Sequence, residues 1–152
     1  MRSLLLITFM ILVAPSCLGA TASSNRTGQT KSCTDAQANA ADNAIDNLNS
    51  WAAAYRWFKE FRGCDDGAIG EGYSEAIAQL LTKRWKQLPV LQRLVLKDKS
   101  FQKFTLLHID ATLSDEELNG IVQNARHRCP SANSHLCSLI ENRAKSSLAE
   151  SQ

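Results

Sequence analysis

The residues best suited to chemistry lie in one stretch, Cys64 to Tyr73, where one helical pattern ends and another begins. It contains three glycines and three acids, Asp65, Asp66 and Glu71. Carboxylates bind hard cations, but these acids lack the alternate spacing of the helix–loop–helix calcium site. Helix capping by an aspartate explains the composition more simply. We therefore predict no metal and no cofactor, and we retain the three acids as candidates for contact with a partner.

His108 is the other residue with catalytic potential, because it lies on the apolar face of a helical pattern. We interpret it as a buried structural histidine. The alternative is a general base that reaches Asp110 or the acidic stretch, although the sequence does not place these groups together. The chain has no G-x-S-x-G turn, and its cysteines are expected to be paired, so we predict no catalytic residue. A small hydrolase that uses Asp65, Asp66 or Glu71 is the alternative.

Hydrophobic periodicity predicts an all-α fold, a compact bundle of about five to six helices over residues 34–145. The first pattern has Ile45, Leu48, Trp51 and Phe58 on one face. The expected later helices cover about 68–88, a short stretch from Pro89, a segment with Phe101, Phe104, Leu107, His108 and Ile109, a helix after the capping box Ser114–Glu117, and about 134–144. Residues 146–152 are interpreted as a flexible tail.

The first 22 residues have the pattern of a signal peptide, with Arg2 before an apolar run and a cleavage site near Ala22. The run is too short to span a bilayer, and no second run follows, so no transmembrane segment is predicted. Residues 23–33 are small and polar and are interpreted as a flexible leader. We expect a periplasmic or secreted protein; lipidation at Cys17, which would give an envelope-anchored structural protein, is the alternative.

Four cysteines remain in the expected mature chain, and they predict two disulfides with three possible pairings. Cys129 and Cys137 are separated by a short loop and form the easiest pair, which leaves Cys33–Cys64 by elimination. An unbroken helix from 34 to 62 would hold that second pair about 43 Å apart, so we expect the helix to start late, near residue 42. The pattern His-x-Cys occurs twice here, but its spacing differs from that of zinc motifs.

Charge is nearly balanced, at +2 for the whole chain and +1 without Arg2 (16 basic against 15 acidic residues). This balance argues against nucleic acid or a membrane surface as the target. The basic residues are nevertheless segregated, since residues 80–103 contain seven and only one acid. We interpret this segment either as a solvated face or as a docking surface for an acidic partner, centred on Lys97, Lys99 and Lys103.

The order of features resembles that of small exported proteins of Gram-negative bacteria, and more loosely that of periplasmic helical immunity proteins against type VI secretion amidases. The segments that carry the resemblance are 61–67, 71–73 and 104–110. It implies a helical inhibitor, often dimeric, that occludes an enzyme's cleft. The sequence therefore leads us to expect a periplasmic binding protein with a protein partner, such as a cell-wall-degrading toxin.

Overall fold

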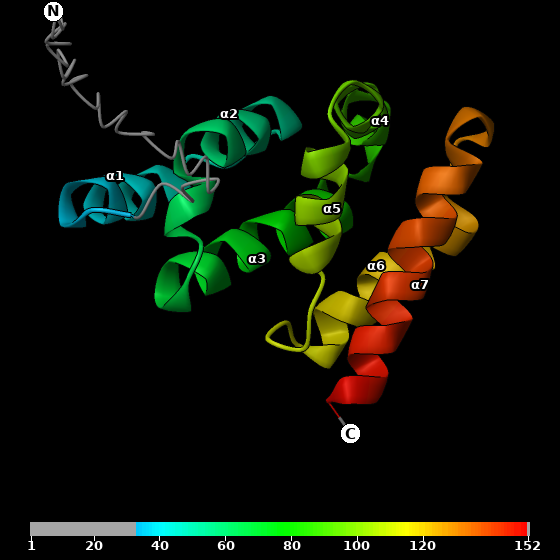
Figure 1. Cartoon of the computed structure of the whole chain (residues 1–152). Helices are drawn as coiled ribbons and strands as arrows, with labels where there is room; N and C mark the ends of the chain where they lie inside the picture. Colours follow the sequence, from blue (N-terminus) through cyan, green and yellow to red (C-terminus); the bar gives the residue numbers. More distant parts are fainter. Residues whose placement is uncertain (1–32, 152) are drawn as a thin grey trace, which may run out of the picture.

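The computed structural model describes residues 33–151, and in this part of the chain every regular element is helical (Figure 1). The predicted signal peptide, most of the leader and Cys17 lie outside the described residues. The all-α prediction is confirmed, with seven α-helices rather than five to six. They are α1 (Asp35–Ile45), α2 (Trp51–Phe61), α3 (Gly67–Lys83), α4 (Leu88–Lys97), α5 (Lys99–Leu107), α6 (Asp115–His127) and α7 (Ser134–Glu150).

The additional helix arises because the first pattern is split at residues 46–50. Ser50 has extended backbone angles, and its side chain accepts a hydrogen bond from the Ala53 N–H, so it caps a new helix, α2. Helices α1 and α2 fold back on each other, which brings Cys33 and Cys64 into a disulfide with a Cα–Cα distance of 4.8 Å. The predicted pairing is therefore confirmed, but the expected late helix start near residue 42 is wrong.

An aromatic cluster joins the first half of the molecule. Trp57 and Phe58 of α2 meet Tyr73 of α3 and Phe104 of α5, with ring centroids 4.4 Å apart for Trp57–Tyr73 and 4.9 Å for Phe58–Phe104. Burial of large aromatic side chains contributes much of the core's stability. The cluster therefore fixes α5 against α2 and α3.

The second half is an aliphatic pair of helices, α6 and α7, which pack side by side (Figure 1). The capping box of Ser114 and Glu117 is present at the start of α6, as predicted. Cys129–Cys137 closes the turn between the two helices, which confirms that pairing. Helix α7 continues to Glu150, beyond the predicted end at residue 144. No helix within residues 33–151 is long and apolar enough to span a membrane.

Candidate functional site

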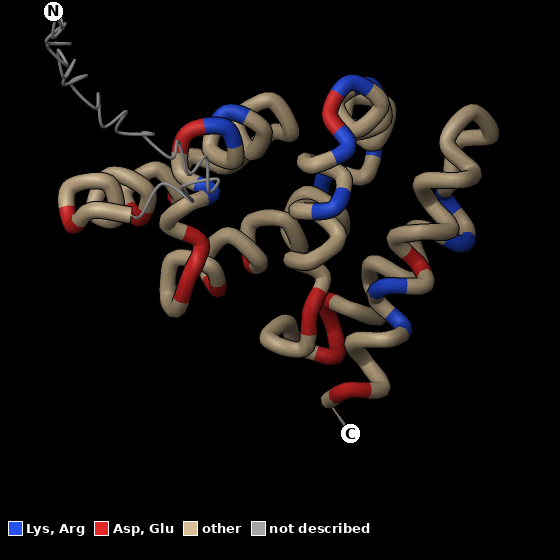
Figure 2. Tube along the Cα trace, in the orientation of Figure 1, with Lys and Arg blue, Asp and Glu red and all other residues tan. Residues whose placement is uncertain are grey.

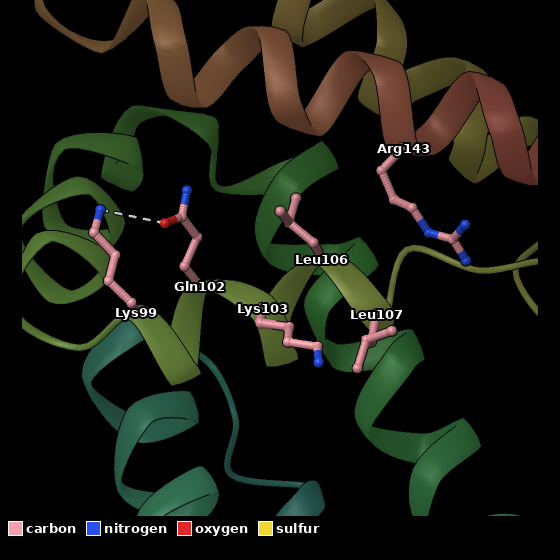
Figure 3. Close-up of a pocket in the computed structure, with 6 residues that line it drawn as sticks. All are labelled: Lys99, Gln102, Lys103, Leu106, Leu107 and Arg143. Carbon is pink, nitrogen blue, oxygen red and sulfur yellow. Dashed lines mark hydrogen bonds between the residues drawn. The ribbon is translucent and has the colours of Figure 1, made fainter.

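A groove lies between α5 and α7, open to solvent and about 410 Å³ in volume (Figure 3). Five of its lining residues come from α5 and one comes from α7. They are Lys99, Gln102, Lys103, Leu106, Leu107 and Arg143. The α5 residues recur at the spacing i, i+3, i+4, i+7 and i+8, so they form one continuous stripe along that helix. We call this feature the α5–α7 groove.

The start of α5 is held by Asp98, which caps the helix. Its Oδ1 accepts hydrogen bonds from the backbone N–H groups of Ser100 and Phe101, at 3.0 and 3.2 Å. Its Oδ2 accepts from the Tyr55 hydroxyl at 3.1 Å and lies 3.5 Å from Lys59 Nζ on α2. The hydrogen bond from the Ser100 hydroxyl, which outweighs the opposing effect of burial, places the pKa of Asp98 far below its usual range. Asp98 therefore fixes the beginning of the groove.

The far wall of the groove is positioned by Ser147 on α7. Its hydroxyl is buried and donates to the Ile109 carbonyl, just after α5, at 2.7 Å. Arg143 lies one turn earlier on the same face of α7, so it is directed toward α5 (Figure 3). Its Nη1 lies 3.4 Å from Glu150 Oε1, and within the described residues its buried Nε has no hydrogen-bond partner. The guanidinium is thus only partly paired within the fold.

The electrostatics of the groove follow from its lining. Three of the six lining side chains are cationic and none is acidic, and Figure 2 shows basic residues gathered on α4 and α5. Leu106 packs against the core, whereas Leu107 is 55% exposed and Leu96, just before Lys97, is 62% exposed. Leu107 was expected on the buried face, but α5 instead buries Phe101 and Thr105. The arrangement suits a ligand that is both acidic and apolar.

The predicted basic residues divide between the groove and its surroundings. Lys99 and Lys103 line the groove, and Lys99 Nζ donates to Gln102 Oε1 at 3.3 Å. Lys97 is exposed at the end of α4 and is not among the lining residues. The structure therefore brings two of the three lysines together with Arg143, which sequence reasoning did not select.

The predicted acidic residues lie elsewhere, at the start of α3. Asp66 is the N-cap of that helix and accepts from the Gly67 N–H at 2.9 Å, the capping role that the sequence suggested. Gly67 has φ of +50°, a conformation that favours glycine. Glu71 is exposed on α3. Asp65 is turned inward, and Gly70 leaves room for it, because a Cβ there would lie 3.1 Å from Asp65 Oδ1.

A polar cluster, which we call the His108 cluster, contains Asp65, Ser74, His108 and Asp110. His108 is buried; its Nδ1 lies 2.9 Å from Ser74 Oγ and its Nε2 3.3 Å from Asp65 Oδ2. Ser74 Oγ donates to Asp110 Oδ2 at 3.1 Å, so its lone pair is free to accept from His108 Nδ1–H. The Nε2–Asp65 contact lacks hydrogen-bond geometry, so the buried Nε2 has no hydrogen-bond partner among the described residues.

The chemistry open to the His108 cluster is restricted. Serine, histidine and carboxylate are the components of a nucleophilic triad, but the Ser74 proton is directed to Asp110 rather than to the histidine. Ser74 is also only 2% exposed. The ring of Tyr73 packs beside His108. Burial, together with the nearby Asp65, raises the pKa of the Tyr73 hydroxyl far above its usual range. These contacts favour the predicted structural role for His108.

Neither Ser74 nor Arg143 is marked as a site residue by any pattern in the sequence. Ser74 is a small polar residue within an apolar helical stretch, and Arg143 is one cation among exposed polar residues of α7. A helical wheel of α5 could have revealed the lining stripe, because its members share one face.

The two His-x-Cys patterns form no metal centre in the structure. Cys129 and Cys137 are bonded to each other, and His127 and His135 are exposed. Within residues 33–151, no three His, Cys, Asp or Glu side chains are grouped so that they could hold a metal ion.

Comparisons of the chain with protein-family models, with curated proteins and with solved structures gave no match.

Proposed function

We propose that the chain is an exported helical binding protein that captures an acidic protein partner through the α5–α7 groove and the adjoining end of α4. The observation that carries the proposal is the groove lining, which combines the cations Lys99, Lys103 and Arg143 with Leu106 and Leu107 and includes no acid. Exposed apolar side chains bordered by charge of one sign are typical of protein interaction sites. The two disulfides support export, because such bonds persist in oxidising compartments.

The sequence resemblance suggests that this binding protein is an inhibitor. A compact helical protein would occlude the cleft of an exported cell-wall-degrading enzyme, as an immunity protein does. A rigid scaffold suits this role, because a preorganised surface loses little conformational entropy on binding. The aromatic cluster, Asp98 and Ser147 provide that rigidity around the groove.

The test is capture of exported proteins from the native host with the oxidised, mature chain as bait. The wild type is compared with a variant carrying Lys97→Glu, Lys99→Glu and Lys103→Glu. The matched control reverses three other exposed charges, Arg56→Glu, Arg84→Glu and Lys86→Glu. We expect the wild type and the control to retain one enzyme at near-stoichiometric yield and to reduce its activity, and the groove variant to lose it.

The proposal fails under two outcomes. One is that no exported protein is retained by the wild type. The other is that the retained protein binds the groove variant as tightly as it binds the control.

A further inference from the structure

We propose that the segment of the partner which enters the α5–α7 groove is an acidic amphipathic helix, with one apolar side chain seated against Leu106 and Leu107 and carboxylates at Lys103 and Arg143. This inference deepens the proposed function and rests on it. It names the kind of surface that the groove recognises.

The shape of the groove lining favours a helix as the occupant. The five α5 residues of the groove follow a helical stripe over two turns, about 12 Å at 1.5 Å per residue. Stripes with this spacing are the surfaces by which helices pack on one another. The opposite face of α5 is already packed, with Phe101 and Thr105 buried. The groove stripe is thus a second helix-packing face, and within residues 33–151 only α7, through Arg143, contributes to its other wall.

The charge of the groove lining favours an acidic occupant. Lys99 and Lys103 lie one turn apart on α5, and Arg143 extends from α7 at the Leu106–Leu107 end of the groove (Figure 3). A partner helix with acids one turn apart would meet this spacing. Arg143 is suited to a carboxylate because a guanidinium can donate two parallel hydrogen bonds, and its contact with Glu150 at 3.4 Å is a long one.

The position of the two leucines favours an occupant that is also apolar on one face. Leu106 joins the groove to the core, and Leu107 is 55% exposed at the end of α5. They lie at one end of the stripe, beyond both lysines. An apolar residue of the partner placed one turn from its acids would cover them, as anchor residues do in helix-in-groove complexes.

The experiment titrates the mature, oxidised chain with a synthetic helical peptide of leucine, glutamate and alanine, in which the leucines lie on one face. NMR reports the methyl groups of Leu106 and Leu107 and the Nε–H of Arg143. One control peptide has lysine in place of glutamate, and a second has the same composition with the leucines dispersed. Dodecanoate tests a small amphipathic carboxylate. The protein variants are Arg143→Gln and, as a matched control, Arg84→Gln.

We expect only the acidic, one-faced peptide to shift the three groove signals to saturation. Arg143→Gln should weaken its binding about tenfold or more, since it removes a charge-assisted contact, and Arg84→Gln should not. Equal binding of the lysine peptide or of the dispersed peptide would overturn the inference. So would saturation by dodecanoate with no response to the peptide, which would make the groove a small-molecule site.

The two proposals can fail separately. If the wild type captures a host enzyme and the lysine variant does not, but the peptide causes no response, the binding function stands and the proposal of a helical ligand fails. If the peptide binds but no host protein is captured, the preference of the groove for an acidic amphipathic helix stands and the proposed binding function fails.

Discussion

The His108 cluster and the α5–α7 groove both place charged side chains between helices, but they use them differently. In the cluster, the Ser74 hydroxyl is hydrogen-bonded to both His108 and Asp110, and Asp65 lies next to the other ring nitrogen of His108. In the groove, Lys103 and Arg143 line a surface that is open to solvent, and no acid is among the lining residues. A charge that is fully paired inside the fold stabilises it. A charge that has no partner among the described residues, like Lys103, or is only partly paired, like Arg143, is available for another molecule.

The largest effect is expected inside the His108 cluster. His108→Ala removes a buried ring that packs on Tyr73 and Phe104, with centroids 4.7 and 4.5 Å away, and leaves Ser74 without one partner. We expect the free energy of unfolding to fall by about 3–5 kcal/mol, measured by urea denaturation at pH 7. A loss below about 1 kcal/mol would show that the ring is not buried as described.

The two disulfides should differ in the stability that they contribute. Cys33–Cys64 spans 31 residues and holds the chain next to Asp65, whereas Cys129–Cys137 spans 8. The chain-entropy relation gives about 4 kcal/mol for the first and about 2.5 kcal/mol for the second. Paired Cys→Ser variants, compared by urea denaturation, should follow this order. The reverse order would mean that packing, rather than the Cys33–Cys64 bond, holds the segment between α2 and α3 in place.

Asp98 supports the groove from inside the fold, and its effect should be intermediate. Asp98→Ala removes the N-cap of α5 and the contacts to Tyr55 and Lys59, so we expect a loss of about 0.5–2 kcal/mol. The pKa of Asp98 is lower in the folded state than in the unfolded chain. Its stabilisation is therefore complete above about pH 4 and is lost as the pH falls through the folded pKa.

The measurement is the free energy of unfolding between pH 2 and pH 7. The wild type should lose stability on acidification more steeply than the Asp98→Asn variant, because the variant has no carboxylate to protonate. Parallel curves for the two proteins would contradict the pKa shift.

Local sequence signals predicted the elements of this fold well. The capping box at Ser114, the cap at Asp66 and both disulfides follow from residue type and spacing, since each depends on neighbours in the chain or on a small number of cysteines. The break at 46–50 was missed because Ile45 and Leu48 continue a plausible helical face across it. Only the Ser50 cap, one polar residue before Trp51, indicated a new start.

The candidate site could be predicted only in part, because it depends on which helices meet. Lys99 and Lys103 were selected through the local excess of positive charge. Arg143 lies forty residues further along the chain, and it reaches the same groove because α7 packs against α5 and Ser147 is hydrogen-bonded to Ile109. The His108 cluster likewise joins residues from the start of α3, from α3 itself and from the end of α5. No spacing rule connects such positions.

The smallest effect on stability should come from the groove itself, and this is where the contrast is tested most directly. Leu107→Ala and Lys103→Gln alter exposed side chains with no internal partner in the described residues, so each should change the free energy of unfolding by less than about 0.5 kcal/mol. Both should weaken binding of the acidic one-faced peptide, and only Lys103→Gln should also reduce the dependence of that binding on salt, because it removes a charge. Urea denaturation and peptide titrations at two salt concentrations measure these effects. If either substitution instead destabilised the protein as much as Asp98→Ala, the groove residues would serve to stabilise the fold rather than to bind another molecule.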